Sequence, residues 1–529
     1  MSRDFQFPGR SPVYGTNGMA ATSHPLATEA AIGVMRRGGN AVDAAITASA
    51  VLAVVEPAMT GIGGDCFAIY AQAGKPLVGI NGAGRSSAAT NLQWFIDKGL
   101  DEVPVNSPQS VTIPGAVDAW DKLLTDHGTI SLGDALQPAI RYAEEGFAVA
   151  PRVALDWAAY KDSLLDDEGS RALYLNNGAV PVAGDIFKLP RLAKTLRVLA
   201  ANGRDGFYEG EIAEAMVRRL RTLGGGQVLE DFAGVSAEYI DPVLCNYRGV
   251  SLAEIPPPTH GVTAQVLLKI LEQFDLKSMD PTGGQRFHLE IEAARSAYRF
   301  RDKFIADPDY MTVPVEGLLS EQLAKSLVSK IDPDKRSLDL GPVEVPGGSD
   351  TTYLTVVDSN WNAVSFINSI YKPFGSGITD PVTGVLFHSR GNCFCVDPDH
   401  PNCIGPSKWP MHTIIPAMVM REGRAQLSYG VMGAAYQPVG QVHAFTNIFD
   451  FGMDVQEAFD HPRLFGHSGP VEYERGIPDA TRIDLIRRGH DLVEVDAPHG
   501  GGQGIFLDWD RGVLIGGSDP RKDGAALGF

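Results

Sequence analysis

The chain has 529 residues, of which 44% are hydrophobic and 21% charged, as expected for a soluble globular protein with one large core or several domains. Its net charge of −19 argues against nucleic acid as a partner, because phosphate binding requires a basic surface. Residues 1–15 hold no apolar signal-peptide core and no run of about 18 apolar residues follows, so we expect a cytoplasmic protein without a membrane span.

Cysteine is sparse in this chain. The five cysteines form an odd set, which favours free thiols in a reducing compartment. They are Cys66, Cys245, Cys393, Cys395 and Cys403. The one-residue spacing of Cys393 and Cys395 differs from that of common zinc sites, so we expect neither a metal nor another cofactor.

The N-terminal region predicts two helices and a turn. A first helix is expected over 26–37, capped by Ser23, and a second over 41–55, where Asn40 and Asp43 have capping-box spacing. The second helix is Ala-rich and apolar nearly all round, which indicates a buried position. The glycine-rich segment after it lacks the Gly-Lys-Ser/Thr ending of a phosphate loop and leads into a strand, so we reject that motif.

The middle of the chain predicts strands, then helices, then a connection. Strands are expected at 66–70 and 77–81, followed by a glycine-rich loop that carries Arg85, a candidate anion ligand if it lies in a pocket. Residues 115–300 are predicted to be mostly helical. Residues 308–350 are rich in Pro, Asp and Gly, which favours a long surface connection.

That connection leads into a predicted hairpin. Strand 351–357 begins with threonine, turns at 358–360 and pairs with strand 363–370. Taken alone, the first strand has an ordinary interpretation, because Thr and Val favour pleated surfaces. The alternative is a self-cleavage point that makes Thr351 a new N-terminus. Further strands, including one at 384–387, and helices follow in separate runs, which favours an α+β fold over a doubly wound parallel sheet.

Several separated segments together resemble the γ-glutamyltranspeptidase family of N-terminal nucleophile hydrolases. The matching segments are 23–28, 38–45, 55–57, 60–64, 138–141, 143–147, 350–354, 356–358, 374–378, 461–463 and 518–524. The resemblance implies a four-layer αββα sandwich and a proenzyme that cuts itself between Asp350 and Thr351. Residues 1–350 would form the large subunit and 351–529 the small subunit of one intertwined domain. A dimer of such heterodimers is one assembly consistent with the resemblance.

The resemblance also assigns roles to individual residues. Thr351 is the nucleophile, and its freed α-amino group, with a reference pKa of about 7.7–8.0, is the base. Ser369 stands where the family has a hydroxyl that supports the nucleophile. The backbone N–H groups of Tyr436 and Gln437 map to the oxyanion hole, and Arg85 maps to the arginine that binds the substrate carboxylate.

The chain departs from the family where the substrate α-ammonium binds. Arg390 and Cys393 replace a glutamine and the key aspartate, His412 and Thr413 replace paired serines, and Tyr371 replaces an asparagine. A buried ammonium without a counter-charge is costly, whereas an added arginine suits a carboxylate. We expect Tyr371, Arg390, His412 and Thr413 to line the substrate site together with Arg85. His412 is expected to contact the substrate at most, rather than to act as a base.

The altered segments are similar to those of the branch that includes oxamate amidohydrolase. They are 389–391, 397–402 and 432–433. We therefore predict an autocatalytically processed amidohydrolase that cleaves a small carboxylate-bearing, oxamate-like amide through an acyl-enzyme on Thr351. A γ-glutamyl hydrolase or transpeptidase acting on glutathione-like substrates and a glutaryl-type acylase are alternatives. An inactive binding protein is disfavoured by the intact Asp350-Thr351-Thr352 segment and Ser369.

Overall fold

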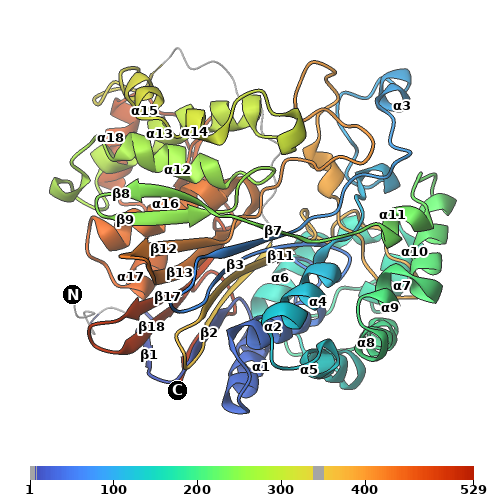
Figure 1. Ribbon diagram of the computed structural model, residues 1–529. Helices are drawn as coiled ribbons and strands as arrows, with labels where there is room; N and C mark the ends of the chain where they lie inside the picture. Colours follow the sequence, from blue (N-terminus) through green and yellow to red (C-terminus); the bar gives the residue numbers. More distant parts are fainter. Residues whose placement is uncertain (1–5, 7–8, 338–350) are drawn as a thin grey trace.

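The computed structural model describes residue 6, residues 9–337 and residues 351–529 (Figure 1). Two seven-stranded sheets, each antiparallel throughout, form its centre. In order, the first sheet contains β19 (Ala525–Gly528), β2 (Met19–Thr22), β10 (Thr352–Val357), β11 (Ala363–Ser369), β3 (Asp65–Ala71), β4 (Val78–Gly82) and β7 (Glu238–Ile240). The second contains β1 (Val13–Gly15), β18 (Val513–Ser518), β17 (Gly501–Asp508), β13 (Arg424–Met432), β12 (Ala417–Arg421), β9 (Val250–Glu254) and β8 (Val243–Tyr247).

The sheets pack face to face through a shared apolar core. Its side chains include Phe67 and Ile367 from the first sheet and Met418 from the second. The two sheets are in close contact where the ring of Tyr353 on β10 lies against Gly430 on β13, because a Cβ added at Gly430 would come within 2.4 Å of the ring. A side chain at position 430 would therefore push β10, and the residue before it, out of place.

Helices cover the outer face of each sheet, which completes four layers (Figure 1). The helices on the side of the first sheet are α1 (Pro25–Arg36), α2 (Ala41–Val55), α4 (Ala116–His127), α5 (Leu132–Glu145) and α8 (Pro190–Asn202). Those on the side of the second are α12 (Gly261–Leu271), α13 (Gly284–Phe304), α16 (Gln437–Phe449) and α17 (Val455–Asp460). The predicted α+β, αββα class is confirmed.

Local signals explain the helix that packs on β10 and β11. Every residue of α2 is buried, and Asn40 and Asp43 form the predicted capping box. The helix packs on β10 and β11, so its apolar surface has a sheet to cover. The preceding helix differs in one detail: its N-cap is His24 rather than Ser23, whose hydroxyl bonds to Glu56 instead.

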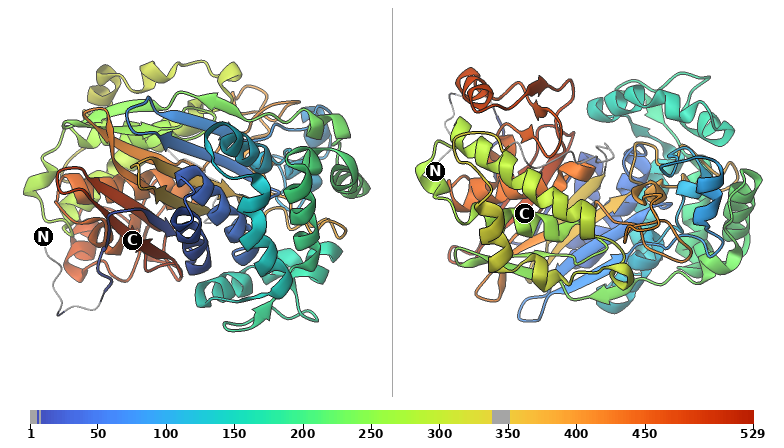
Figure 2. Two further views of the ribbon diagram at one scale, coloured as in Figure 1. Left: turned by 60° about the horizontal axis from the view of Figure 1, so that its bottom comes forward. Right: turned by 90° about the horizontal axis from the view of Figure 1, so that it is seen from above.

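Two smaller lobes rise from the sandwich (Figure 2). One is helical and contains α6 (Pro151–Ala159) and the 3₁₀ turn η2 (Lys161–Leu164). The other is a three-stranded sheet of β14 (Leu464–Phe465), β15 (Val471–Tyr473) and β16 (Leu492–Glu494), flanked by α18 (Asp479–Arg487). In the described part of the chain, no helix combines the length and apolarity that a bilayer span needs.

Two sequence expectations need comment. The strand expected at 384–387 does not form; Leu386 makes only an isolated bridge with Thr379. The predicted cleavage point between Asp350 and Thr351 lies partly outside the described residues, because Asp350 is not among them. Both sheets contain strands from before residue 338 and strands from after residue 350, so neither stretch builds a sheet on its own.

Candidate active site

The hairpin of β10 and β11 brings two hydroxyl groups together. Thr351 directly precedes β10 and is buried, and its Oγ1 lies 3.1 Å from Oγ of Ser369 at the end of β11. The Ser369 hydroxyl also accepts a hydrogen bond of 2.9 Å from the N–H of Tyr371. The predicted pairing of Thr351 with Ser369 is therefore present in the structure.

A buried charged cluster lies beside this pair. Asp65 stands opposite Ser369 in the register of β3 and β11. Its Oδ2 lies 3.0 Å from Nδ1 of His388, 3.6 Å from Nε2 of His412 and 3.7 Å from Nε of Arg390. All four side chains are fully buried. We call these four residues the charged cluster.

The sequence predicts no role for Asp65, which follows two glycines at the start of a strand. An acidic residue at the start of a strand whose other residues are apolar is the signal that could have found it. Its partners come from segments more than 300 residues away, so the sequence offered no sign of the cluster.

The neighbouring groups set the charge of each member. Burial raises the pKa of Asp65, but the adjacent His388, His412 and Arg390 outweigh this and hold the pKa below its usual range. Burial lowers the pKa of His412 well below its ordinary value, and the nearby Arg390 lowers it further. At neutral pH Asp65 is an anion that balances Arg390, and His412 is neutral.

Arg390 keeps binding capacity in this environment. Its Nη1 donates to Oγ1 of Thr413 at 2.9 Å, and its guanidinium lies 4.5 Å from the ring centre of Tyr371. Within residues 9–337 and 351–529 nothing accepts a hydrogen bond from its Nη2, and its Nε is too far from Asp65 to donate. A planar guanidinium with unused donors is suited to a carboxylate.

Arg85 occupies a different environment. Its Nη1 donates to Asp307 at 3.0 Å and to the Ser407 carbonyl at 3.1 Å, and its guanidinium stacks 3.6 Å from the ring centre of Trp409. The side chain is 36% exposed and borders a cavity of about 730 Å³. The contacts found in the described residues tie Arg85 to this cavity and not to the charged cluster.

The residues to which the resemblance assigns the oxyanion hole form a turn with a defined set of backbone hydrogen bonds. A 3₁₀ turn covers Ala434–Tyr436. The N–H of Tyr436 donates to the Gly433 carbonyl at 2.8 Å, and the N–H of Gln437 bonds to the Ala434 carbonyl. The two N–H groups that the sequence assigned to the oxyanion hole are therefore engaged inside the turn. The first N–H groups of the turn, on Ala434 and Ala435, have no partner within it.

The backbone around this turn is held in unusual conformations. Gly433 has a φ of +123°, and Ala434 and Tyr371 have φ values of +45° and +76°. Positive φ is costly for residues with a Cβ and persists where the surroundings impose it. Ala434, Tyr371 and Cys393 pack in one small apolar cluster, which joins the turn to the residue that bonds Ser369.

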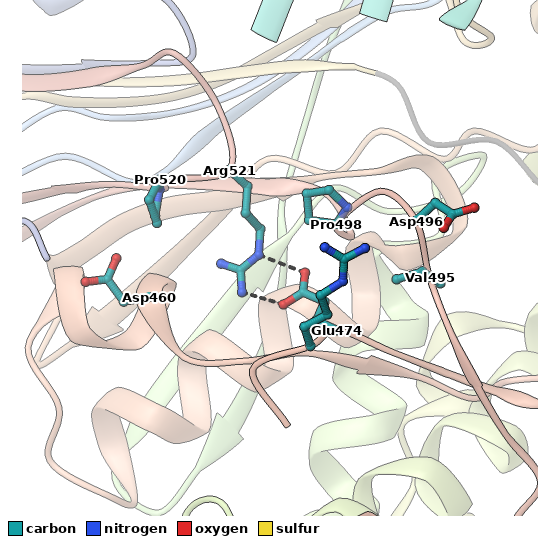
Figure 3. Close-up of a pocket in the computed structure, with 8 residues that line it drawn as sticks. Asp460, Glu474, Val495, Asp496, Pro498, Pro520 and Arg521 are labelled. Atoms are coloured by element: carbon teal, nitrogen blue, oxygen red, sulfur yellow. Dashed lines mark hydrogen bonds and ion pairs between the residues drawn. The ribbon is translucent and has the colours of Figure 1, made fainter. Parts of the chain in front are cut away.

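Two cavities adjoin this region. The larger, about 840 Å³, is bordered by Gly433, Ala435 and Tyr436 of the turn, by Tyr160 of the helical lobe and by residues 465–500 of the β14–β16 lobe. The smaller, about 320 Å³, lies next to it and contains Arg521 and Glu474, which pair through two hydrogen bonds (Figure 3). Because Arg521 and Glu474 neutralise each other, the charged groups in the smaller cavity have a structural role and need no ligand.

A metal would not suit the charged cluster. Two imidazoles and a carboxylate are common metal ligands, but the Arg390 guanidinium beside them repels a cation. In the part of the chain that the structure describes, no group of His, Cys, Asp and Glu residues is arranged to hold a metal ion.

Comparisons with known proteins agree with the resemblance found in the sequence. A family model for gamma-glutamyltranspeptidase matches residues 27–529. The glutathione hydrolase-like YwrD proenzyme of Bacillus subtilis (strain 168) is 37% identical over 98% of this chain and 99% of its own. The oxamate amidohydrolase proenzyme of Klebsiella pneumoniae subsp. pneumoniae is 34% identical over 97% of this chain and 99% of its own.

A solved structure supports the same relationship. The crystal structure of a cephalosporin acylase from Bacillus halodurans matches this fold with a TM-score of 0.93 at 36% identity, covering 100% of this chain and 99% of its own. Sequence and fold thus agree over nearly the whole length. The chain belongs to the gamma-glutamyltranspeptidase family.

Proposed function

We propose that this protein is a self-processing amidohydrolase that uses Thr351 to cleave the amide bond of a small carboxylate-bearing substrate. Its relatives from Bacillus subtilis and Klebsiella pneumoniae bear names that describe proenzymes, which supports cleavage before Thr351. Cleavage at this point converts the Thr351 amide nitrogen into an amine. Only the amine can accept the hydroxyl proton, so processing switches on the base.

The reaction then follows from the positions of the two hydroxyls. Oγ1 of Thr351 attacks the amide carbonyl while its proton passes to the Thr351 amine, and the Ser369 hydroxyl keeps Oγ1 oriented. The C–N bond breaks as the amine part of the substrate takes that proton and leaves. Water then attacks the Thr351 ester, which releases the carboxylic acid and restores the hydroxyl.

The oxyanion that forms in this reaction needs donors that are not already in use. We assign this role to the N–H groups of Ala434 and Ala435, because those of Tyr436 and Gln437 bond inside the turn. Positive φ at Gly433 and Ala434 orients successive N–H groups towards one side, a geometry that favours anions.

The observation that carries the substrate assignment is the buried Arg390 with its unused Nη2. A substrate carboxylate can accept from Nη2 and, through a small shift, from Nε, while Thr413 holds Nη1. Asp65 is already balanced by Arg390, so it offers no spare charge to a substrate ammonium. The site thus favours a carboxylate without an α-amino group, such as oxamate, over a γ-glutamyl group.

The test uses purified protein that has been checked by denaturing gel. Cleavage before Thr351 gives fragments of about 37 and 19 kDa from the 56.6 kDa chain. The processed protein is then given oxamate, a glutaryl amide and a γ-glutamyl anilide, with ammonia or aniline detected. Fastest turnover of oxamate supports the proposal. Faster turnover of the γ-glutamyl compound, or full activity in an uncut chain, contradicts it.

A further inference from the structure

The 840 Å³ cavity has no role in binding the acyl part of the substrate. It lies between Tyr160 of the helical lobe and the β14–β16 lobe, and the oxyanion turn forms one edge. Its volume is within the range of sites for drug-sized ligands. If the amine released by the enzyme were ammonia, nothing in the reaction would need this space.

The cavity reaches the reaction centre through a short chain of contacts. Its edge includes Gly433 and Ala435, which flank Ala434, and Lys372, which directly follows Tyr371. Ala434 packs against Tyr371, whose N–H bonds the Ser369 hydroxyl beside Thr351. Arg390 of the charged cluster also contacts Tyr371, with its guanidinium 4.5 Å from the ring centre. Tyr371 therefore contacts both Arg390 and the turn that borders the cavity.

One part of the cavity wall is a group of stacked aromatic and imidazole rings. Phe465 and His467 stack with centroids 4.2 Å apart and planes inclined by 24°, and Tyr436 and His499 stack at 5.1 Å and 21°. Phe465 also meets Tyr436 edge to face at 5.3 Å. These contacts fix the rings in place, so they present a rigid surface that a further ring can join.

The imidazoles in this wall are uncharged at neutral pH. Burial lowers the pKa of His467 to about 3 and that of His499 to about 4. Nε2 of His467 lies 3.2 Å from the Ser468 hydroxyl, and Nε2 of His499 lies 3.4 Å from Glu472. Neutral imidazoles stack on aromatic rings without the cost of burying a charge.

We propose that this cavity binds the amine half of the substrate, and that this half carries an aromatic or heteroaromatic ring. The inference rests on the proposed function and adds to it a substrate class, the N-aryl or N-heteroaryl amides of small carboxylic acids. The bond broken is the same C–N bond, and the leaving group takes the proton that ammonia would have taken. The carboxylate end lies against Arg390 and the ring end against Phe465 and His467.

The test compares two substrates that share an acyl group and differ only in the amine. Oxamate releases ammonia and N-phenyloxamate releases aniline. The ratio of their kcat/KM values therefore measures the effect of the amine part, which is the part assigned to the cavity. Aniline is intrinsically the better leaving group, so the ratio in the natural protein proves nothing by itself. The informative quantity is the change in this ratio when Phe465→Leu or His467→Ala removes a ring. A matched control is Ile483→Ala, on the exposed face of α18.

We expect each ring variant to lower the preference for N-phenyloxamate roughly 3- to 10-fold, mainly through KM, while the control does not change it. Loss of both activities in the same proportion, or no change in the ratio, overturns the inference. If neither oxamate compound is turned over, the proposed acyl specificity fails, and the same ratio is measured with glutamine and γ-glutamylanilide. A ring-dependent change there retains the cavity assignment, and its absence overturns it.

Discussion

Arg390 and Arg85 are both candidate carboxylate ligands in the sequence, yet they occupy opposite environments in the fold. Arg390 is fully buried, keeps an unused Nη2 and lies 3.7 Å from Asp65, which stands opposite Ser369. Arg85 is 36% exposed, pairs with Asp307 and covers Trp409. A buried guanidinium with an unused donor gains most from an anionic ligand, whereas one that is paired and exposed gains little. The comparison predicts that substrate specificity depends on Arg390.

The largest effect is expected at Thr351, the proposed nucleophile, which attacks the substrate that either arginine would bind. Thr351→Ala removes the attacking hydroxyl, so both chain cleavage and turnover should be lost. A denaturing gel and an ammonia assay measure the two. The control is Thr352→Val, which loses one hydrogen bond to the Asn368 carbonyl and should lower the free energy of unfolding by about 1 kcal/mol while still cleaving. A cleaved, active Thr351→Ala protein would contradict the mechanism.

The arginine comparison itself is tested by one substitution at each position. Arg390→Lys keeps the charge that balances Asp65 but loses the planar donors, so kcat/KM for oxamate should fall about 100-fold. Arg85→Lys should lower it by less than about 3-fold, because its contacts lie in another cavity. Both are measured by steady-state kinetics, with thermal unfolding as the check on folding. The opposite ranking would restore Arg85 as the carboxylate ligand.

Asp65 should act by positioning Arg390 rather than by touching the substrate. Asp65→Asn keeps the shape but leaves the guanidinium without its counter-charge, so KM should rise about 10-fold while kcat changes little. The free energy of unfolding should fall by about 3 kcal/mol, because a buried charge loses its partner. If kcat fell by as much as KM rose, or if only the free energy of unfolding changed, Asp65 would have no role in positioning Arg390 for substrate binding.

Glu56, a second buried carboxylate, shows by contrast how the cations near Asp65 affect its pKa. Burial raises the pKa of Glu56 to about 7 from 4.5, in contrast to Asp65, whose cationic neighbours lower it. The folded chain therefore holds a proton on Glu56 that the unfolded chain has lost, and stability falls as the pH rises from about 4.5 to 7. The full drop is about 3 kcal/mol.

Glu56→Gln has no proton to lose and should abolish this dependence. Chemical denaturation at pH 4 and pH 8 is the measurement: the variant should match the natural protein at the lower pH and exceed it at the higher. Turnover should be the least affected of all the variants, since Glu56 bonds to Ser23 and takes no part in the reaction. Parallel stability curves for the two proteins would show that Glu56 is charged throughout.

Much of this protein was predictable from local sequence. The buried helix over 41–55, its capping box and the hairpin after residue 350 follow from apolar periodicity, side-chain caps and turn residues, which act over a few positions. The segment around Thr351 and the placement of Ser369 on the next strand followed from the same hairpin and from the family resemblance. The missing strand at 384–387 shows the limit: apolar residues there pack without a neighbouring strand to pair with.

Only the tertiary structure decided which charges share a compartment. Asp65 lies more than 300 residues before Arg390 and His412, and nothing local to Asp65 encodes the other two. Strand register places Asp65 opposite Ser369, whereas Arg85 lies at a different cavity. The sequence by itself determined the fold, and it predicts Thr351 as the nucleophile and a site without the family's ammonium ligand. The charge balance around Arg390 arises from long-range packing, because a buried ion's state depends on neighbours in space rather than in sequence.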